Sequence, residues 1–249
     1  MILNYYPARS IIHSLDPRAK LIFTFIFIIS VLFETSFTAY VILFIIVLLP
    51  FLLSKLPLYR LIKGIIPFLI LFFITILFHF LLTPGEVIFK FGMLKGTIEG
   101  LKNGTTFAIR LFLIIITTMI LGLTTSPIGL SESISGIFNR FKSSSIKEIP
   151  MIIILTLRFI PFLIREGKRI LMAQRARGAE LKFGKDFFTI LFPIFNSAFK
   201  RADQLALALH AKAYEPGSIR ASFQVYRLCV WDYIFLCYSL IPIFIVIFV

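Results

Sequence analysis

The sequence predicts an all-α integral membrane protein with about five transmembrane helices and two long crossing helices between the fourth and the fifth. Of the 249 residues, 59% are apolar and only 15% are charged, the apolar residues gather in long runs, and the formal net charge is +14. A soluble domain carries about 25% charged residues, so the composition excludes a soluble globule and a disordered chain. The lipid bilayer must therefore cover part of this surface.

Five apolar runs are candidates for the membrane-spanning helices. They cover residues 21–33, 38–53, 61–82, 107–125 and 228–249. The first two flank a polar break and fit a helical hairpin. Membrane strands alternate lipid-facing and lumen-facing residues, whereas these runs are apolar on every side, so helices are expected. A signal peptide is the alternative for the first run, but no small-x-small cleavage site follows Phe33.

The distribution of cations orients the helices in the membrane. Three Lys or Arg precede the first run and three lie around the turn between the second and third, whereas the turn between the first and second has none. Residues 142–227 hold 15 Lys and Arg against 6 Asp and Glu. The positive-inside rule then places the N-terminus in the cytoplasm and the C-terminus outside. We expect a membrane domain at 1–125, a cytoplasmic region at 126–227 and a C-terminal transmembrane helix at 228–249.

The cytoplasmic region contains the pattern of two long helices. Between 149 and 175, Arg158, Arg165 and Arg169 fall on one narrow stripe and the other faces are apolar, which suits a helix at the membrane interface. A second helix is expected from about 186 to 213.

A ridge of small residues follows the second of these helices. Ala198, Ala202 and Ala206 recur every four residues, and such ridges let two helix backbones approach closely. The two cytoplasmic helices are therefore expected to cross at these alanines. In the membrane runs small-xxx-small spacing is nearly absent, so a loosely packed, Phe-rich surface is expected there, open to another membrane protein.

Both cytoplasmic helices end in a small residue, a cation and another small residue. The two ends are Ala176, Arg177 and Gly178, and Ala211, Lys212 and Ala213. Glycine caps helix C-termini and a cation there suits the helix dipole, so a single end of this kind needs no partner. Two of them on the arms of a crossing predict a matched pair of contact points.

No catalytic, cofactor-binding or metal site is predicted on this chain. The sequence contains no GxxxxGK[ST], GxSxG, HExxH or CxxC motif, and its three histidines have no partner at metal-ligand spacing. We therefore do not expect an enzyme, and in particular do not expect ATP hydrolysis by this chain.

Short motifs in register along nearly the whole chain resemble the transmembrane (T) component of energy-coupling-factor ABC transporters, the EcfT/CbiQ-like family. They are SLDPRAKL at 14–21, EGL at 99–101 with RL at 110–111, TT at 124–125, LRFIP at 157–161 and AQRARG at 173–178. The resemblance implies an energy-coupling subunit of a prokaryotic cell membrane.

The resemblance also implies partners and a role for the two helix ends. In the family, each of two coupling helices ends in an Ala-Arg-Gly-like motif that docks on one of two ATPase subunits, which hold ATP and Mg. The membrane part holds a substrate-binding S component for vitamin or metal-ion uptake. Residues 176–178 match the first motif. Residues 211–213 occupy the second, where Lys replaces Arg and Ala replaces Gly, so the charge stays but the bidentate guanidinium is lost.

Two other classes of function are compatible with the composition. A stand-alone secondary transporter or channel requires a polar path with Gly or Pro breaks at mid-membrane, and Pro50 and Pro67 lie near the ends of their runs. A membrane scaffold without transport is the other. Nucleic-acid binding is the poorest interpretation of the basic composition, because the positive-inside rule already accounts for the cations.

Overall fold

The structure is a computed structural model that describes residues 5–8, 10–91, 94–138, 144–177, 187–215 and 229–248. The chain divides into two compact units. We call the first, Met1–Leu130 with Tyr226–Val249, the membrane unit, and the second, Ser131–Val225, the two-helix unit.

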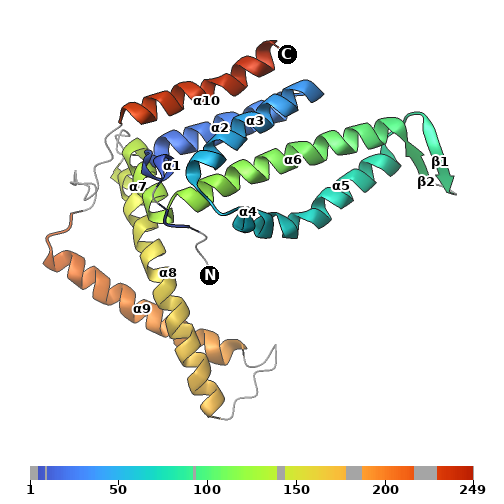
Figure 1. The fold of residues 1–249 in the computed structure, drawn as a ribbon. Coiled ribbons are helices and arrows are strands. Elements are labelled where there is room, and N and C mark those ends of the chain that lie inside the picture. The colour runs from blue at the N-terminus through green and yellow to red at the C-terminus, as the bar shows by residue number, and fades with distance from the viewer. Residues whose placement is uncertain are drawn as a thin grey trace. The chain divides into compact units, whose positions relative to one another are not determined.

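Helices make up almost all of the described chain (Figure 1), and a single short hairpin of strands lies between two of them. In order the elements are α1 Ile11–Ser14, α2 Pro17–Phe33, α3 Phe37–Ser54, α4 Leu58–Ile65, η1 Ile66–Phe68, α5 Leu69–Leu82, β1 Val87–Phe91, β2 Leu94–Thr97, α6 Ile98–Thr124, α7 Pro127–Phe138, α8 Ser144–Ala176, α9 Phe187–Ala211 and α10 Val230–Phe248. The predicted all-α class is confirmed.

Four helical stretches among the described residues are long and apolar enough to cross a membrane. They are Phe37–Ser54, Leu58–Leu82, Ile98–Thr124 and Val230–Phe248, and they match the second to fifth predicted runs. The helix of the first run, α2, has 17 residues, which is about 26 Å at 1.5 Å per residue. It packs along α10 and α6, and its crossing of the bilayer stays a prediction.

Local sequence signals set the helix ends of the membrane unit. Asp16 is the N-cap of α2 and its side chain accepts a hydrogen bond from Arg18 N, while Pro17 occupies the first helical position, where its missing N–H costs nothing. Thr97 caps α6 in the same way by accepting from Gly100 N. These caps satisfy backbone donors that have no partner inside a helix.

The core of the membrane unit lies where α2, α3 and α6 meet. Phe27, Val31 and Leu43 are fully buried there, and Leu113 is 1% exposed. Phe235 of α10 packs against this core, with its ring centre 5.0 Å from that of Phe23. Lipid is as apolar as these side chains, so close packing holds such a core together more than escape from water does.

The contact between α5 and α6 is closer than the sequence led us to expect. A Cβ atom on Gly100 would collide with the backbone of His79 and Phe80, and one on Gly104 would lie 3.0 Å from the Ile76 Cα. Gly100 and Gly104 are four residues apart on one face of α6. The expectation that the membrane part is loosely packed is therefore wrong here, because two glycines of α6 form a small-xxx-small contact.

A polar cluster fixes the turn between α2 and α3. The Arg110 guanidinium on α6 donates through Nη2 to Glu34 O at 2.8 Å and to Tyr40 Oη at 3.1 Å. The Tyr40 hydroxyl donates to the same Glu34 carbonyl at 2.6 Å. The Glu34 carboxylate accepts from the N–H groups of Thr35 and Ser36. Arg110 of α6 is thus hydrogen-bonded to the C-terminal end of α2, through Glu34, and to α3, through Tyr40.

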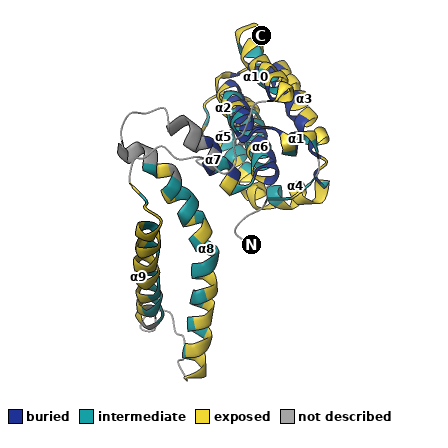
Figure 2. Cartoon of the chain, turned by 90° about the vertical axis from the view of Figure 1, so that its left-hand side faces the viewer, coloured by how far each residue is buried: buried dark blue, intermediate teal, exposed yellow. Residues whose placement is uncertain are grey.

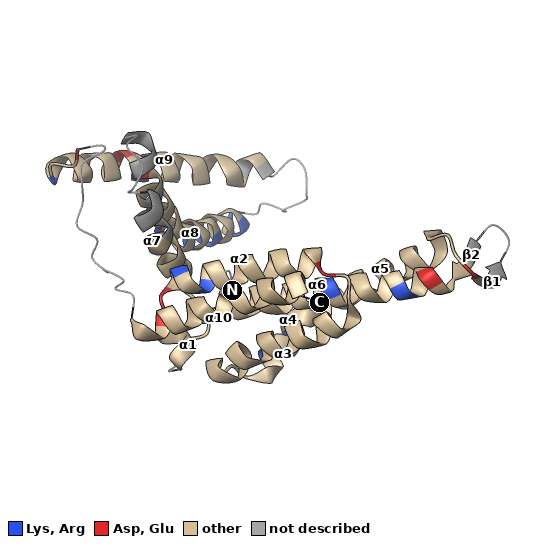
Figure 3. Cartoon of the chain, turned by 90° about the horizontal axis from the view of Figure 1, so that it is seen from above, with Lys and Arg blue, Asp and Glu red and all other residues tan. Residues whose placement is uncertain are grey.

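The two-helix unit consists mainly of α8, with 33 residues, and α9, with 25. Of their residues whose exposure is described, none is buried, as the teal and yellow helices of Figure 2 show. Lys and Arg recur along α8, whereas α3 in the membrane unit is free of them (Figure 3). The amphipathic character predicted for this part of the chain stays a prediction.

Candidate docking site

The first predicted contact point lies at the C-terminal end of α8. This helix ends at Ala176, and the N–H of Arg177 donates to Ala173 O at 3.2 Å and to Gln174 O at 3.1 Å. The shared hydrogen bond closes the last turn and fixes the Arg177 backbone. Ala176 and Arg177 are exposed. Gly178, the third residue of the predicted motif, lies outside the described residues.

The second predicted contact point repeats this geometry at the end of α9. The helix ends at Ala211, and the N–H of Lys212 donates to Ala208 O at 3.2 Å and to Leu209 O at 3.1 Å. Ala211, Lys212 and Ala213 are all exposed. Both cations therefore follow a helix that closes with the same pair of backbone bonds.

The backbone at Ala213 explains why glycine suits the third position. Ala213 has a φ of 53°, its N–H donates to His210 O at 2.9 Å, and Tyr214 N donates to Leu209 O at 3.0 Å. These two bonds form a Schellman motif, in which a left-handed residue ends the helix. An L-residue pays about 1–2 kcal/mol for this conformation, and glycine does not. The corresponding residue of the first motif is Gly178.

Replacing Ala213 with glycine should stabilise the C-terminal end of α9. Glycine removes the left-handed penalty but loses more backbone entropy, so a net gain of about 0.5–1 kcal/mol is expected. The amides at 213 and 214 should then exchange with solvent about 2–5 times more slowly. Ala211→Gly is the matched control, because glycine inside the last turn weakens the helix and should speed exchange. Unchanged or faster exchange in Ala213→Gly would contradict this account of the cap.

The two long helices pack against one another at their middle stretches. The Arg201 guanidinium of α9 lies over the Phe162 ring of α8, 4.7 Å from its centre. Gly167 of α8 faces α9, since a Cβ atom there would lie 3.5 Å from Ile194 Cδ1. The later α8 residue pairs with the earlier α9 residue, so the helices run in opposite senses where they cross (Figure 1).

The described contact does not run along the predicted alanine ridge. Ala198 is half-buried, whereas Ala202 and Ala206 are exposed. A crossing centred on these three alanines stays a prediction. Sequence reasoning missed Gly167, although a lone glycine inside a long amphipathic helix is a signal of close packing.

An apolar seam follows one face of α9. Phe188, Phe192, Phe195 and Phe199 are spaced by four, three and four residues, and each is more than half exposed. Ala202 and Ala206 continue the same spacing. We call Phe192, Phe195, Phe199, Ala202 and Ala206 the α9 seam, and these five positions form an exposed apolar face of α9.

Both helix ends extend well beyond the contact between α8 and α9. Arg177 follows Gly167 by ten residues and Lys212 follows Arg201 by eleven, or about 15 and 16 Å at 1.5 Å per residue. Because the helices run in opposite senses, the two cations project from opposite sides of the contact. Each can therefore meet a separate protein surface.

Metal-ligating side chains do not gather in the described ranges. No group of three or more His, Cys, Asp or Glu residues there is arranged to hold a metal ion. The candidate site is thus a pair of exposed cationic helix ends.

Comparison with known proteins agrees with this class of membrane protein. The family model described as "Cobalt transport protein", CbiQ, matches residues 8–223. Relatives called "Energy-coupling factor transporter transmembrane protein EcfT" include one from Listeria innocua, 39% identical over 91% of this chain and 89% of that protein. Another from Acidaminococcus fermentans is 37% identical over 87% and 84%. A third from Staphylococcus aureus is 35% identical over 100% and 96%.

The fold and these comparisons define a multi-pass helical membrane subunit of a transport system. The chain belongs to the CbiQ family, and it is an EcfT-type transmembrane component of an energy-coupling-factor transporter. Components of this kind are membrane subunits and not themselves catalytic.

Proposed function

We propose that this chain couples ATP hydrolysis by two ATPase subunits to substrate import by a membrane S component. ATP and Mg are held by the ATPases, which dock at residues 176–178 and 211–213. The substrate is a vitamin or a metal ion selected by the S component. The N-terminus and the two-helix unit lie in the cytoplasm, and the C-terminus lies outside, in keeping with the positive-inside rule.

The observation that carries the proposal is the matched pair of helix ends. Two exposed cations follow helices closed by equivalent backbone bonds, and they project from opposite sides of one helix contact. An arginine at such a position can form a bidentate pair with a carboxylate. Closure of two ATPases would move the two ends toward each other or apart and change how α8 crosses α9.

Two open apolar surfaces support a membrane partner. In the stretch Leu58–Leu82 the most apolar window has none of its residues buried within this chain. The α9 seam adds exposed phenylalanines in the two-helix unit. Exposed apolar area of this extent marks a surface covered by lipid or by another protein, and we assign part of it to the S component.

Purification of the tagged chain in mild detergent separates the three candidate functions. Co-purification of two ATPase subunits supports energy coupling. Substrate flux through the purified chain alone supports a secondary transporter or channel. A chain with neither property is a scaffold. The last two results would each contradict the proposed function.

Lys212→Ala should weaken ATPase co-purification less than Arg177→Ala. Lysine offers a point charge, whereas arginine offers two parallel N–H donors to a carboxylate. Replacing Lys212 therefore removes less of the binding free energy than replacing Arg177. The measurement is the amount of ATPase retained per chain after washing at fixed salt. Lys200→Ala and Arg165→Ala, at exposed positions of α9 and α8, are the matched controls and should retain the wild-type amount. The reverse order would show that the second end is the stronger dock.

A further inference from the structure

Near both chain connections between the two units, one segment close to the N-terminus forms hydrogen bonds with the end of α6 and with the start of α10. The membrane unit is interrupted after Leu130 and resumes at Tyr226. The first point falls inside α7, Pro127–Phe138, which begins three residues after the end of α6 at Thr124. The second point lies shortly before α10, which begins at Val230. Side chains and backbone of residues 6–20 bond to both helix ends.

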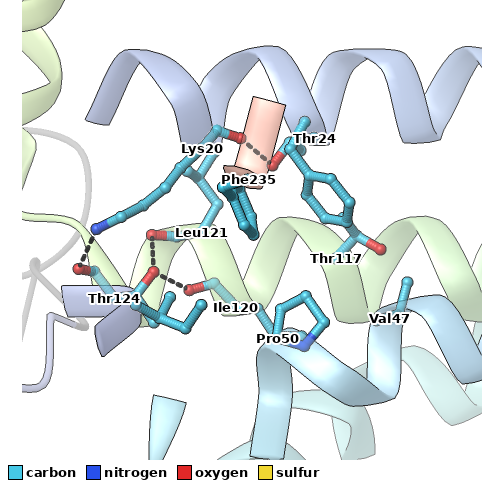
Figure 4. A pocket seen from close by; sticks show the side chains of 11 residues that line it. Lys20, Thr24, Val47, Pro50, Thr117, Ile120, Leu121, Thr124 and Phe235 are labelled. Atoms are coloured by element: carbon cyan, nitrogen blue, oxygen red, sulfur yellow. Dashed lines mark hydrogen bonds between the residues drawn. The ribbon is translucent and has the colours of Figure 1, made fainter. Parts of the chain in front are cut away.

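The end of α6 receives two hydrogen bonds from this segment. Tyr6 N donates to Leu123 O at 3.0 Å, and the Lys20 ammonium donates to Thr124 O at 3.4 Å (Figure 4). The last carbonyls of a helix have no partner within it, and a cation is favoured at this negative end of the helix dipole. Lys20 and Tyr6 thus satisfy carbonyls that would otherwise need water.

The first turn of α10 is tied to the start of α2 by one carboxylate. Asp232 accepts from Asp16 N through Oδ1 and from Cys229 N through Oδ2, each at 2.7 Å. The first bond joins residues 216 positions apart in the chain. A carboxylate in the first turn also suits the positive end of the helix dipole.

Three charged side chains form this arrangement and all are buried. Asp16 is 3% exposed, Lys20 4% and Asp232 2%. One Asp16 oxygen, Oδ2, has no hydrogen-bond partner in the described part of the chain. Lys20 lies one helical turn further along α2, and residues four apart on a helix are neighbours on its surface. Buried charges persist only where partners compensate them, so we treat Asp16, Lys20 and Asp232 as one cluster and call it the junction clamp.

The segment that precedes the clamp is itself held in place. His13 Nε2 donates to Tyr6 O at 2.9 Å, and His13 O accepts from the Lys20 ammonium at 3.5 Å. Burial lowers the pKa of His13, in keeping with a neutral ring whose Nδ1 accepts from the Ser10 hydroxyl at 2.7 Å. Beside Lys20 lies a cavity of about 20 Å³, lined by three threonines and a majority of apolar side chains, which is room for about one water molecule.

We propose that the junction clamp transmits movement of the two-helix unit into the membrane unit. It joins the ends of α6 and α10 to the start of α2, so that a pull on either chain connection moves three membrane helices together. Without the clamp, the pull would instead fray the last turn of α6 or the first turn of α10. This role rests on the proposed function, because it requires ATP-driven movement of the two-helix unit.

Hydrogen exchange of the purified chain tests whether the clamp exists. Asp232→Asn keeps the shape of the side chain but turns one acceptor into a donor that faces an N–H group. The amides of the first turn of α10 and of Asp16 should exchange at least tenfold faster, while those of α5 stay unchanged. Lys102→Met, at an exposed position of α6, is the control and should show no change. Unchanged exchange in Asp232→Asn would overturn the clamp.

If Asp232→Asn does not fold, Lys20→Met combined with Asp232→Asn takes its place. The double variant removes one charge of each sign, so the net charge of the cluster stays the same. The same acceleration is expected at the ends of α6 and α10, and its absence would again overturn the clamp.

The ratio of ATP hydrolysed to substrate imported tests the transmission role. The complex that co-purifies with the chain is reconstituted in vesicles, with labelled Co²⁺ or a labelled vitamin as the probe, whichever the wild-type complex imports. For Asp232→Asn we expect ATPase subunits and hydrolysis to be retained and the ratio to rise at least tenfold. A residue with a merely structural role would lower both rates in parallel.

The outcomes separate the clamp from the proposed function. Faster exchange with an unchanged ratio would overturn the transmission role, as would a parallel loss of both rates. A wild-type chain that carries no ATPases would overturn the proposed function and the transmission role together, while faster exchange would still support the clamp.

Discussion

Replacing Arg177 with glutamate should abolish ATP-driven uptake while leaving the chain in the membrane. The substitution places an anion at the negative end of the α8 dipole and reverses the charge offered to an ATPase carboxylate. Removing one partner of a desolvated ion pair costs about 2–5 kcal/mol, which is roughly 30-fold or more in affinity. Uptake should therefore fall to background, measured in cells or vesicles beside an immunoblot of the membrane fraction.

Arg169→Glu is the matched control for this experiment. Arg169 lies on the same helix, is exposed and belongs to the charged stripe, but it is seven residues before the last helical residue, Ala176. Its reversal should leave uptake close to that of the wild type. Uptake that survives Arg177→Glu would refute docking at this end, and equal loss in both variants would show that the overall charge of α8 matters instead of its end.

Replacing Gly100 with alanine should destabilise the membrane unit. The added Cβ would collide with the backbone of His79 and Phe80 on α5, and neither backbone can rotate away as a flexible side chain can. Overpacking of this kind costs about 1–3 kcal/mol. The expected result is a lower apparent melting temperature of the purified chain in detergent, and Gly100→Leu should prevent accumulation of folded protein.

Gly122 gives a matched control on the same helix. A Cβ atom there meets nothing within 4 Å, and alanine is a better helix former than glycine by about 1 kcal/mol. Gly122→Ala should therefore leave the melting temperature unchanged or raise it. If Gly100→Ala is as stable as Gly122→Ala, then α5 and α6 do not pack as closely as the structure has them.

Patterns along the chain predicted the helices well. The apolar runs from 38 to 125 and from 228 correspond to α3, α5, α6 and α10, because uninterrupted apolar stretches of this length have few alternatives. The long second cytoplasmic helix, expected from about 186 to 213, is α9, since a cap and breaker signal marks its end. The docking role of its last residues rests on the resemblance and stays a proposal.

Contacts between helices were harder to predict, because no local pattern specifies which faces meet. The alanines of α9 have ideal spacing for a crossing, yet the described contact uses Gly167 and Ile194. Gly100 and Gly104 stand in a stretch with polar neighbours, so their role against α5 was missed. Asp16 and Asp232 are 216 residues apart, and only the fold shows that one hydrogen bond joins them.

ATP-driven import by the reconstituted complex tests the central claim most directly. Vesicles would contain the chain, its co-purified ATPases and the S component, and labelled Co²⁺ and labelled vitamins would serve as probes. Energy coupling predicts uptake that requires ATP and all of these subunits, and that stops when this chain is left out or carries Arg177→Glu. Uptake through this chain alone, without ATP or the ATPases, would contradict the account and identify a secondary transporter or channel.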